Sequence, residues 1–256
     1  MKKVILFLSI WIFVFVSCSK EEEFIINQPT GEVLLKKLIV EGKTYNLTYN
    51  GSKISEVNGP FYKEVYTYEG DFITKILSYD SGNLYMTKTY TYENGNLKTF
   101  IDNTERFNSM DKTVYINNSD GTVSYVKTNI QKATQEETPN LTGKLTFSNG
   151  VLIKDEYISS NPNTNVTSSV YNYEYDNQNG FQKNVIGFDK LLNLDKYNFN
   201  WTKSTFVTNY NNNGVLSSSN PEIQYLTYEY NDNGYPKLQK YYAFGSLRST
   251  GELFYE

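Results

Sequence analysis

The chain has 256 residues, of which 39% are apolar and 16% aromatic, and it contains no histidine. The lack of histidine excludes a Ser–His–Asp triad, a histidine general base and a histidine metal ligand, and the single cysteine excludes an intramolecular disulfide and a thiolate zinc cluster. The formal net charge is −4, whereas a nucleic-acid-binding surface needs clustered Lys and Arg, so we expect no nucleic-acid partner.

The first segment, residues 1–17, has the pattern of a secretory signal peptide. A basic start, Met1-Lys2-Lys3, precedes an apolar run over residues 4–16 that is too short to span a bilayer as a helix. The run ends in Phe15-Val16-Ser17-Cys18, which resembles the lipobox of bacterial lipoproteins, with Phe15 where that motif usually has Leu. The resemblance implies that residues 1–17 are a lipoprotein signal peptide and that Cys18 is the lipid attachment site. An ordinary signal peptide is the alternative.

An acidic run follows the cysteine. Lys20, Glu21, Glu22 and Glu23 resemble the export tag that directs Bacteroidetes-type lipoproteins to the cell surface. The resemblance implies a protein that is lipid-anchored in the outer membrane of a Gram-negative bacterium and exposed at the cell surface. A solvated linker is the alternative, because short charge runs are usually linkers. Residues 18–31 are therefore interpreted as the acylated cysteine and an acidic tether.

From residue 32 onward the sequence has the rhythm of β-hairpins. Asn-Gly pairs mark tight turns, because a type I′ turn needs positive φ at both central residues, and they stand between runs of strand-forming residues. These runs alternate with period two, as in Tyr90-Thr91-Tyr92, which places the aromatic side chains on one face. We predict that residues 32–256 form one all-β domain, an antiparallel meander of about 14–18 strands, with positive φ at Gly95, Gly180 and Gly234.

Five stretches share the form aromatic-x-aromatic, an acidic or amide residue, glycine and then an apolar residue. They are residues 49–54, 66–76, 90–100, 173–183 and 228–240. Each is interpreted as a hairpin that cannot bury its apolar face alone, so the hairpins should join in a closed or partly open barrel with the tyrosines on its inner face. A transmembrane barrel is the alternative. It needs an outward apolar band on nearly every strand, whereas many strands here present Thr, Asn and Lys.

Residues 184–193 depart from the hairpin pattern. Their apolar positions have the spacing of a helical face: Val185, Phe188, Leu191 and Leu192. We predict a short helical crossing, which Gly187 weakens because glycine disfavours helix. In such a crossing Gly187 should tolerate substitution better than the turn glycines.

Two stretches carry a resemblance to a known family. Residues 173–194 and 225–242 are similar to Bacteroidetes-type surface lipoproteins of unknown function with a porin-like β fold, and the repeated hairpins resemble the YD-type repeats of bacterial secreted proteins. The resemblance implies an all-β, barrel-like domain with an apolar ligand cavity, and it carries no catalytic residues. Gly180-Phe181 stands where the family has Pro after the turn, so this crossing is expected to differ.

Catalytic and metal sites have little support in the sequence. Two acidic pairs invite comparison with the carboxylates of a glycosidase, but both stand at hairpin ends, where acidic residues are ordinary: Glu174 with Asp176, and Glu229 with Asp232. Residues 229–234 are similar to the start of an EF-hand loop, yet Lys240 stands at the position of the bidentate Glu. No phosphate-binding glycine motif occurs. We expect a protein that is not an enzyme, with no catalytic residue, cofactor or metal ion.

The aromatic ladders are the remaining feature that points to a function. Tyrosine presents an apolar ring and a polar hydroxyl, which suits glycans and lipid head groups, although cross-strand aromatic pairs also stabilise a sheet without any ligand. We predict a non-enzymatic, surface-anchored binding module for a lipid-like or glycan ligand. A hydrolase or accessory protein acting on polysaccharide is the alternative. The candidate ligand-binding residues, with Trp201 foremost, are Tyr173, Tyr175, Tyr197, Phe199, Trp201, Tyr228 and Tyr230.

Overall fold

The structure is a computed structural model, and it describes residues 32–160, 165–192, 199–212 and 215–256. The chain divides into two units, residues 1–31 and 32–256, and all described residues belong to the second. The predicted signal peptide, Cys18 and the acidic run lie outside the described residues.

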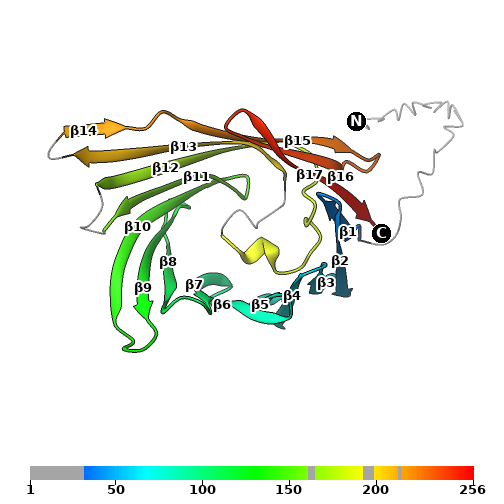
Figure 1. Cartoon of the computed structure of the whole chain (residues 1–256), viewed down its shortest axis with the longest axis horizontal. Coiled ribbons are helices and arrows are strands. Elements are labelled where there is room, and N and C mark those ends of the chain that lie inside the picture. Colours follow the sequence, from blue (N-terminus) through cyan, green and yellow to red (C-terminus); the bar gives the residue numbers. More distant parts are fainter. Residues whose placement is uncertain (1–31, 161–164, 193–198, 213–214) are drawn as a thin grey trace, which may run out of the picture. The chain divides into compact units, whose positions relative to one another are not determined.

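The described residues form seventeen β-strands (Figure 1). Their bounds are β1 (Leu35–Val40), β2 (Lys43–Asn50), β3 (Lys53–Asn58), β4 (Tyr62–Glu69), β5 (Phe72–Asp80), β6 (Asn83–Glu93), β7 (Asn96–Thr104), β8 (Ser109–Asn117), β9 (Val123–Gln131), β10 (Glu137–Ser148), β11 (Val151–Ser159), β12 (Val166–Tyr175), β13 (Trp201–Asn212), β14 (Val215–Ser218), β15 (Glu222–Tyr230), β16 (Pro236–Ala243) and β17 (Ser246–Tyr255).

These strands close into a single antiparallel barrel. Strands that follow one another in sequence pair side by side, and β1 completes the ring by pairing with both β2 and β17. β14 and β15 pair with successive parts of β13, residues 209–212 and 203–206, so together they occupy one position. The described strands therefore form a closed ring of sixteen positions, and a ring of antiparallel pairs requires an even number. The predicted all-β antiparallel meander is confirmed.

Paired positive φ angles shape the tight hairpin turns. Asn94-Gly95 has φ of 52° and 79°, and Asn149-Gly150 has φ of 50° and 79°, as a type I′ turn requires. Gly95 and Gly234 have the predicted positive φ, but the prediction for Gly180 is wrong. The backbone N–H of Asn179 donates to the Gly234 carbonyl (3.0 Å), so Asn179-Gly180 rests against another turn instead of forming one.

The repeated hairpins are confirmed for four of the five stretches. Residues 49–54, 66–76, 90–100 and 228–240 form the β2–β3, β4–β5, β6–β7 and β15–β16 hairpins, and in each the register shifts beside the second tyrosine of the Tyr-x-Tyr pattern or its equivalent. Residues 173–183 do not form a hairpin, because β12 ends at Tyr175 and the next strand begins only at Trp201. The connection between them follows a different path.

Residues 176–192, which we name the plug segment, turn into the interior of the barrel after β12 (Figure 1). The regular structure in the described part of this connection is a 3-10 helix, η1 (Phe188–Lys190). Val185, Phe188 and Leu191 are buried in the core, so the predicted apolar face is the buried one. The predicted helical crossing is a single turn, because Gly187 at its start has φ of 94°, which an α-helix does not accommodate.

Gly187 is more constrained than a turn glycine. A Cβ at this position would lie 2.9 Å from Cγ1 of Ile73 and 3.2 Å from the backbone oxygen of Asp71, whereas a Cβ at Gly95 would meet open space. The expectation that Gly187 tolerates substitution is therefore wrong. Both the close approach and the positive φ require glycine here.

Hydrogen bonds fix the plug segment to the barrel wall. The Ile186 N–H donates to the Ser52 carbonyl (3.0 Å), and the Tyr68 hydroxyl donates to the Ile186 carbonyl (3.1 Å). The Asn184 amide donates to the Tyr235 hydroxyl (2.9 Å). These bonds join the segment to turns or strands from both ends of the chain, so its backbone is seated as well as its apolar side chains.

The inner face of the wall is aromatic and aliphatic. Tyr90 pairs with Phe100 and Tyr115 with Tyr125, with ring centroids 5.1 Å and 6.2 Å apart, and these rings belong to or pack against the core that contains Phe188. Since side chains alternate along a strand, the residues next to these aromatic residues in each strand point to the outside of the barrel. The tyrosines of the repeats lie on the inner face, as predicted.

Among the helices of the described residues, none is long and apolar enough to cross a membrane. No group of three or more Asp, Glu, His or Cys side chains in the described part of the chain is arranged to hold a metal ion.

Candidate ligand-binding site

A cavity of about 260 Å³ lies between the plug segment and the wall formed by β13, β15, β16 and β17. Gln239 pairs with Gly251, two residues from the core residue Leu253, so the side chain of Gln239 belongs to the inner face. We name this space the lumen cavity. It is lined by Phe181, Asn200, Trp201, Leu226, Tyr228, Gln239, Tyr241 and Ser249.

Three polar side chains of the lumen cavity have unused hydrogen-bonding groups. Asn200 is 2% exposed, and its Nδ2 donates to the Asn179 carbonyl (3.0 Å), but its Oδ1 accepts no hydrogen bond. The side chains of Gln239 and Ser249 form no hydrogen bond with other described residues. A buried polar atom without a partner costs about 1–3 kcal/mol, so a ligand that supplies the partner is stabilised there.

Aromatic rings supply the apolar part of the lumen cavity. Trp201 and Tyr241 meet edge to face, with centroids 6.5 Å apart and an interplanar angle of 73°. The Tyr228 hydroxyl donates to the Trp201 carbonyl (3.0 Å), which fixes the tyrosine against β13. Rings beside a few convergent polar groups are the usual composition of a small-molecule site.

The structure brings Trp201 and Tyr228 together in the lining of the lumen cavity. The other described candidates lie outside this lining, although the ring of Tyr230 is close to that of Tyr228, with centroids 6.0 Å apart. Tyr173 stacks on Tyr171 with centroids 6.2 Å apart. The Tyr230 hydroxyl donates to the Asp176 carboxylate at the start of the plug segment, and burial, followed by this bond, raises the pKa of Tyr230.

Three candidates remain from the aromatic set. Burial raises the pKa of Tyr175 to about 12, but the residue does not line the lumen cavity. Phe199 is half-buried immediately before β13 and is also outside the lining. Tyr197 lies outside the described residues.

Most of the polar lining was missed by the sequence reasoning. Gln239 and Tyr241 alternate along β16 and face Tyr228 and Leu226 of β15, but this pairing depends on the register shift beside Tyr230. The alternation of Gln239 and Tyr241 can be recognised in the sequence, but the residues of β15 that they face cannot. Asn200 gave no signal, because a single asparagine before a strand is common in turns.

Of the acidic residues considered as catalytic pairs, Glu174 and Asp176 take part in other contacts. The Glu174 carboxylate forms an ion pair with Lys203 (2.7 Å), while Asp176 accepts hydrogen bonds from Tyr230 and from the Gln178 N–H (3.1 Å). In the turn near Glu229 and Asp232, Oδ1 of Asn231 accepts from two backbone N–H groups. None of these carboxylates lines the lumen cavity.

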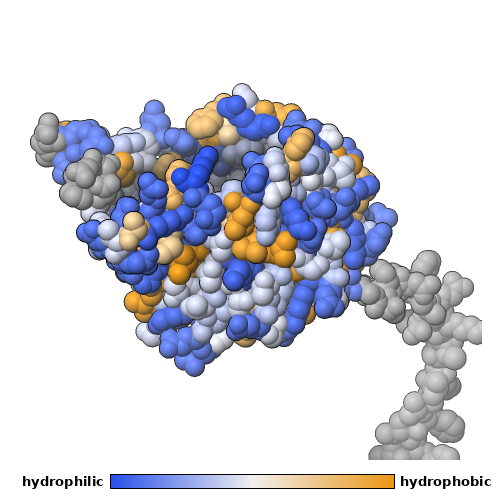
Figure 2. Space-filling model, turned by 60° about the horizontal axis from the view of Figure 1, so that its bottom comes forward, coloured by the Kyte–Doolittle hydropathy of each residue, from blue (hydrophilic) through white to orange (hydrophobic). Residues whose placement is uncertain are grey.

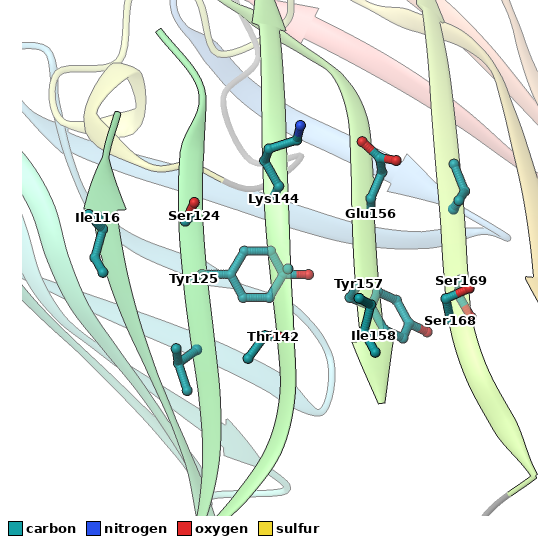
Figure 3. Close-up of a pocket in the computed structure, with 13 residues that line it drawn as sticks. Ile116, Ser124, Tyr125, Thr142, Lys144, Glu156, Tyr157, Ile158, Ser168 and Ser169 are labelled. Carbon is teal, nitrogen blue, oxygen red and sulfur yellow. The ribbon is translucent and has the colours of Figure 1, made fainter. Parts of the chain in front are cut away.

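A second space lies on the barrel wall across β8 to β12, and Figure 3 shows its lining. We name this open hollow of about 570 Å³ the wall groove. Thr142 pairs with Val126 and Ile158 and neighbours the inward-facing Gly143, so these three side chains point outward. The outward side chains of its lining are Ile116, Ser124, Val126, Thr142, Lys144, Glu156, Ile158, Ser168 and Val170.

The closed antiparallel barrel with an occupied interior places this protein in the class of porin-like folds. Two solved structures are similar to it: a porin-like protein from Bacteroides vulgatus, at 19% identity and TM-score 0.61, and a porin-like protein from Bacteroides uniformis, at 11% identity and TM-score 0.50. The first match covers 88% of this chain and 99% of that one, and the second covers 87% and 98%. The porin-like β fold inferred from the sequence is confirmed. No family model and no curated protein matches the chain.

Proposed function

We propose that this protein is a lipid-anchored protein of the outer membrane, exposed at the cell surface, that binds a small saccharide in the lumen cavity without catalysing a reaction. The observation that carries the ligand class is the composition of that cavity. It combines the rings of Trp201, Tyr228 and Tyr241 with the polar side chains of Asn200 and Gln239. Sugars present apolar C–H faces and ring hydroxyls, which match rings and amides respectively.

The size of the lumen cavity supports a small ligand. Pockets for drug-sized ligands have volumes of about 300–1,000 Å³, and the lumen cavity, at about 260 Å³, lies just below that range. A single sugar ring fits better than a long oligosaccharide or a folded lipid. The unpaired Oδ1 of Asn200 can accept one of its hydroxyls.

The charged side chains on the outer wall favour a barrel that is surrounded by water and not by lipid. Its charged side chains form ion pairs between neighbouring strands, such as Lys63 of β4 with Glu56 of β3 (2.7 Å), and along one strand, such as Lys154 with Glu156 of β11 (2.9 Å). Charged residues at the midplane of a lipid-facing wall destabilise a barrel by about 2–4 kcal/mol each. On the face shown in Figure 2, hydrophobic side chains form separate patches among hydrophilic ones.

Location rests on the resemblance to a lipobox at Cys18 and to an export tag over residues 20–23. Stable anchoring needs two or more acyl chains, which a processed lipoprotein cysteine carries. Replacing Cys18 with Ala should abolish palmitate labelling. Replacing Glu21, Glu22 and Glu23 with Ala should preserve labelling but protect the protein from protease added to intact cells. Equal cleavage of the wild type and the variant with Glu21, Glu22 and Glu23 replaced would show that the acidic run is only a tether.

The saccharide proposal is tested by the emission of Trp201. Residues 32–256 contain all the described strands and the core, and Trp201 is the one tryptophan among them. We expect a saturable change in emission when this domain is titrated with glucose, galactose, N-acetylglucosamine or their disaccharides. Gln239→Ala should weaken binding about fivefold, because a lost hydrogen bond contributes roughly 1 kcal/mol.

Gln224→Ala is the matched control. Gln224 lies on β15 opposite Ala243 and does not line the lumen cavity. Its replacement should leave the titration unchanged. The proposal fails if no saccharide changes the emission, or if the two glutamine variants lose affinity equally.

A further inference from the structure

Exposed phenylalanine rings lie in the turns at one end of the barrel. Successive turns of an antiparallel ring lie at alternate ends, so every second turn shares the end opposite the one where the plug segment enters. Phe61, Phe107 and Phe244 lie in turns of that opposite end and are 68%, 53% and 68% exposed. No described turn at the plug end has an exposed large apolar side chain. We name the turns of the opposite end the distal rim, which comprises residues 41–42, 59–61, 81–82, 105–108, 132–136 and 244–245.

Neither local conformation nor the core accounts for these three rings. Phe244 has φ of 53°, the left-handed conformation that asparagine takes in the Asn-Gly turns and that a bulky residue rarely adopts. The Phe61 carbonyl accepts from the Ser81 N–H (2.7 Å), and the Phe107 N–H donates to the Thr104 carbonyl (3.1 Å). The backbone of each turn is therefore fixed, and the rings are presented to solvent from it.

The exposed rings are separated from one another around the distal rim. The turn at residues 41–42 lies between those of Phe244 and Phe61, and the turn at residues 81–82 lies between those of Phe61 and Phe107. These intervening turns are Glu-Gly and Ser-Gly, which are polar. A protein partner needs a contiguous, well-packed apolar core in its interface, whereas the interface of a lipid bilayer accepts separate aromatic side chains. The distribution of the rings therefore favours a lipid surface.

Charges of both signs stand beside the rings. The Arg106 guanidinium lies over the Phe107 ring (4.8 Å), and the Arg248 guanidinium of β17 lies over the Phe244 ring (5.7 Å). The turns of the distal rim also contain other ionisable residues, which are Glu41, Glu105, Lys132 and Glu136. With three carboxylates, two cations in the turns and Arg248 next to them, the distal rim has no positive excess that would select an anionic lipid. A zwitterionic head group, which carries both signs, matches this surface.

The chain before residue 32 is long enough to bring the distal rim to a membrane. Residues 18–31 reach up to about 46 Å when extended, at roughly 3.3 Å per residue. A strand such as β7, which has 9 residues, spans about 30 Å between the two ends of the barrel. A membrane that holds Cys18 is thus within reach of the distal rim, and the tether raises the local concentration of lipid there.

We propose that the distal rim rests on a zwitterionic lipid surface, with the rings of Phe61, Phe107 and Phe244 inserted among the head groups. Aromatic rings favour this interfacial depth, while Arg106 and Arg248 keep their guanidinium groups at the level of the phosphates. The wall of the barrel stays in water. The proposal rests on the proposed membrane anchor for its partner, and it is separate from the saccharide site because the distal rim and the lumen cavity share no residue.

The test is the quenching of tryptophan emission by phosphatidylcholine vesicles whose acyl chains carry bromine close to the head group. An N-terminal polyhistidine tag and a nickel-chelating lipid hold residues 32–256 on the vesicles, so the outcome does not depend on acylation of Cys18. Relative to vesicles without bromine, Phe61→Trp, Phe107→Trp and Phe244→Trp should each lose emission. The wild type, with Trp201 in the lumen cavity, gives the baseline.

Two control positions show whether quenching is confined to the distal rim. Ile158 is 61% exposed on the wall, and Asp232 is exposed in a turn at the plug end. Ile158→Trp and Asp232→Trp should keep the emission that they have on vesicles without bromine.

Replacing two of the rings separates insertion from tethering. In the tagged protein with Phe107→Trp, the pair Phe61→Ser and Phe244→Ser should lower the equilibrium constant for insertion at least about tenfold, because each apolar ring removed from water contributes severalfold. The matched pair Ile116→Ser and Ile158→Ser, which removes exposed aliphatic residues of the wall, should leave it unchanged. The melting temperature of each variant verifies that it is folded.

Three results would overturn the proposal. These are no quenching at the three rim positions, equal quenching at the rim and control positions, or equal effects of the two pairs of Ser replacements. Sedimentation of residues 32–256 without vesicles is the remaining arm. A dimer that Phe61→Ser with Phe244→Ser abolishes would assign the distal rim to a second copy of the chain and refute the lipid contact. Loss of palmitate labelling bears on the anchor at Cys18 alone, so the two proposals fail by different measurements.

Discussion

The tyrosines of the repeats act first as structural residues. The Tyr49 hydroxyl donates to the Leu35 carbonyl (2.7 Å), and the Tyr92 hydroxyl donates to the Ile73 carbonyl (2.8 Å). Each bond crosses from the end of one strand to the start of another, and burial raises the pKa of both tyrosines. Sheet stabilisation therefore accounts for these repeats without a ligand. The lumen cavity draws on Trp201 and Tyr228 together with Tyr241, which the repeats did not single out.

A buried carboxyl gives the fold a pH dependence. Burial raises the pKa of Asp155 above its ordinary value, although the Tyr125 hydroxyl bond opposes this shift. The native state then holds a proton that the unfolded state has lost, so the free energy of unfolding falls as pH rises from the ordinary to the raised pKa.

We predict that Asp155→Asn flattens this pH dependence. The asparagine oxygen still accepts from Tyr125, while the buried charge disappears. Urea unfolding at pH 4 to pH 7 should show a smaller loss of stability in the variant than in the wild type. Parallel curves for the two proteins would show that Asp155 does not titrate in this range.

The plug segment contributes buried side chains to the core inside the barrel. Phe188 is 6% exposed and packs near Tyr66, with ring centroids 6.1 Å apart. Leu191 is also buried, near Tyr90 of β6 and Leu97 of β7 in the wall. The core of the domain is therefore shared between wall and plug segment.

We predict that Phe188→Ala destabilises the domain by about 3–5 kcal/mol, as for other large-to-small core substitutions. Phe61→Ala is the control, because Phe61 is 68% exposed in a turn, and it should change stability by less than about 0.5 kcal/mol. Denaturant unfolding of both variants measures the difference. A small effect of Phe188→Ala would mean that the wall is stable without the plug segment.

The hairpins could be predicted from sequence because their signals are local. Asn94-Gly95 and Asn149-Gly150 predict tight turns because Asn and Gly accept the positive φ angles that these turns require. The plug segment could not, because its apolar spacing matches a helix while its conformation is set by contacts with residues such as Tyr68 and Ser52 far away in sequence. The prediction of a positive φ at Gly180 was wrong for the same reason. An Asn-Gly pair predicts a hairpin only where a second strand follows.

The whole molecule depends on pairing between the two ends of the domain. β1 and β17 join Leu35 to Tyr255 and Leu38 to Leu253, which closes the ring. Sequence periodicity indicates that strands must pair, but it does not indicate which edges meet last, because that depends on shear and twist accumulated over the ring. The closure and the lining of the lumen cavity were therefore beyond sequence reasoning, whereas the all-β meander was not.

The plug segment of this closed, porin-like barrel is seated in its interior by buried side chains and backbone hydrogen bonds. Amide hydrogen exchange of residues 32–256 tests it most directly at Ile186, whose N–H donates to the Ser52 carbonyl (3.0 Å). A seated plug segment predicts protection on the order of hours, similar to the amides of β6 and β7, because exchange then requires opening of the core. Exchange of the Ile186 amide within seconds, while the amides of the wall strands stay protected, would show that the plug segment is not seated in the barrel.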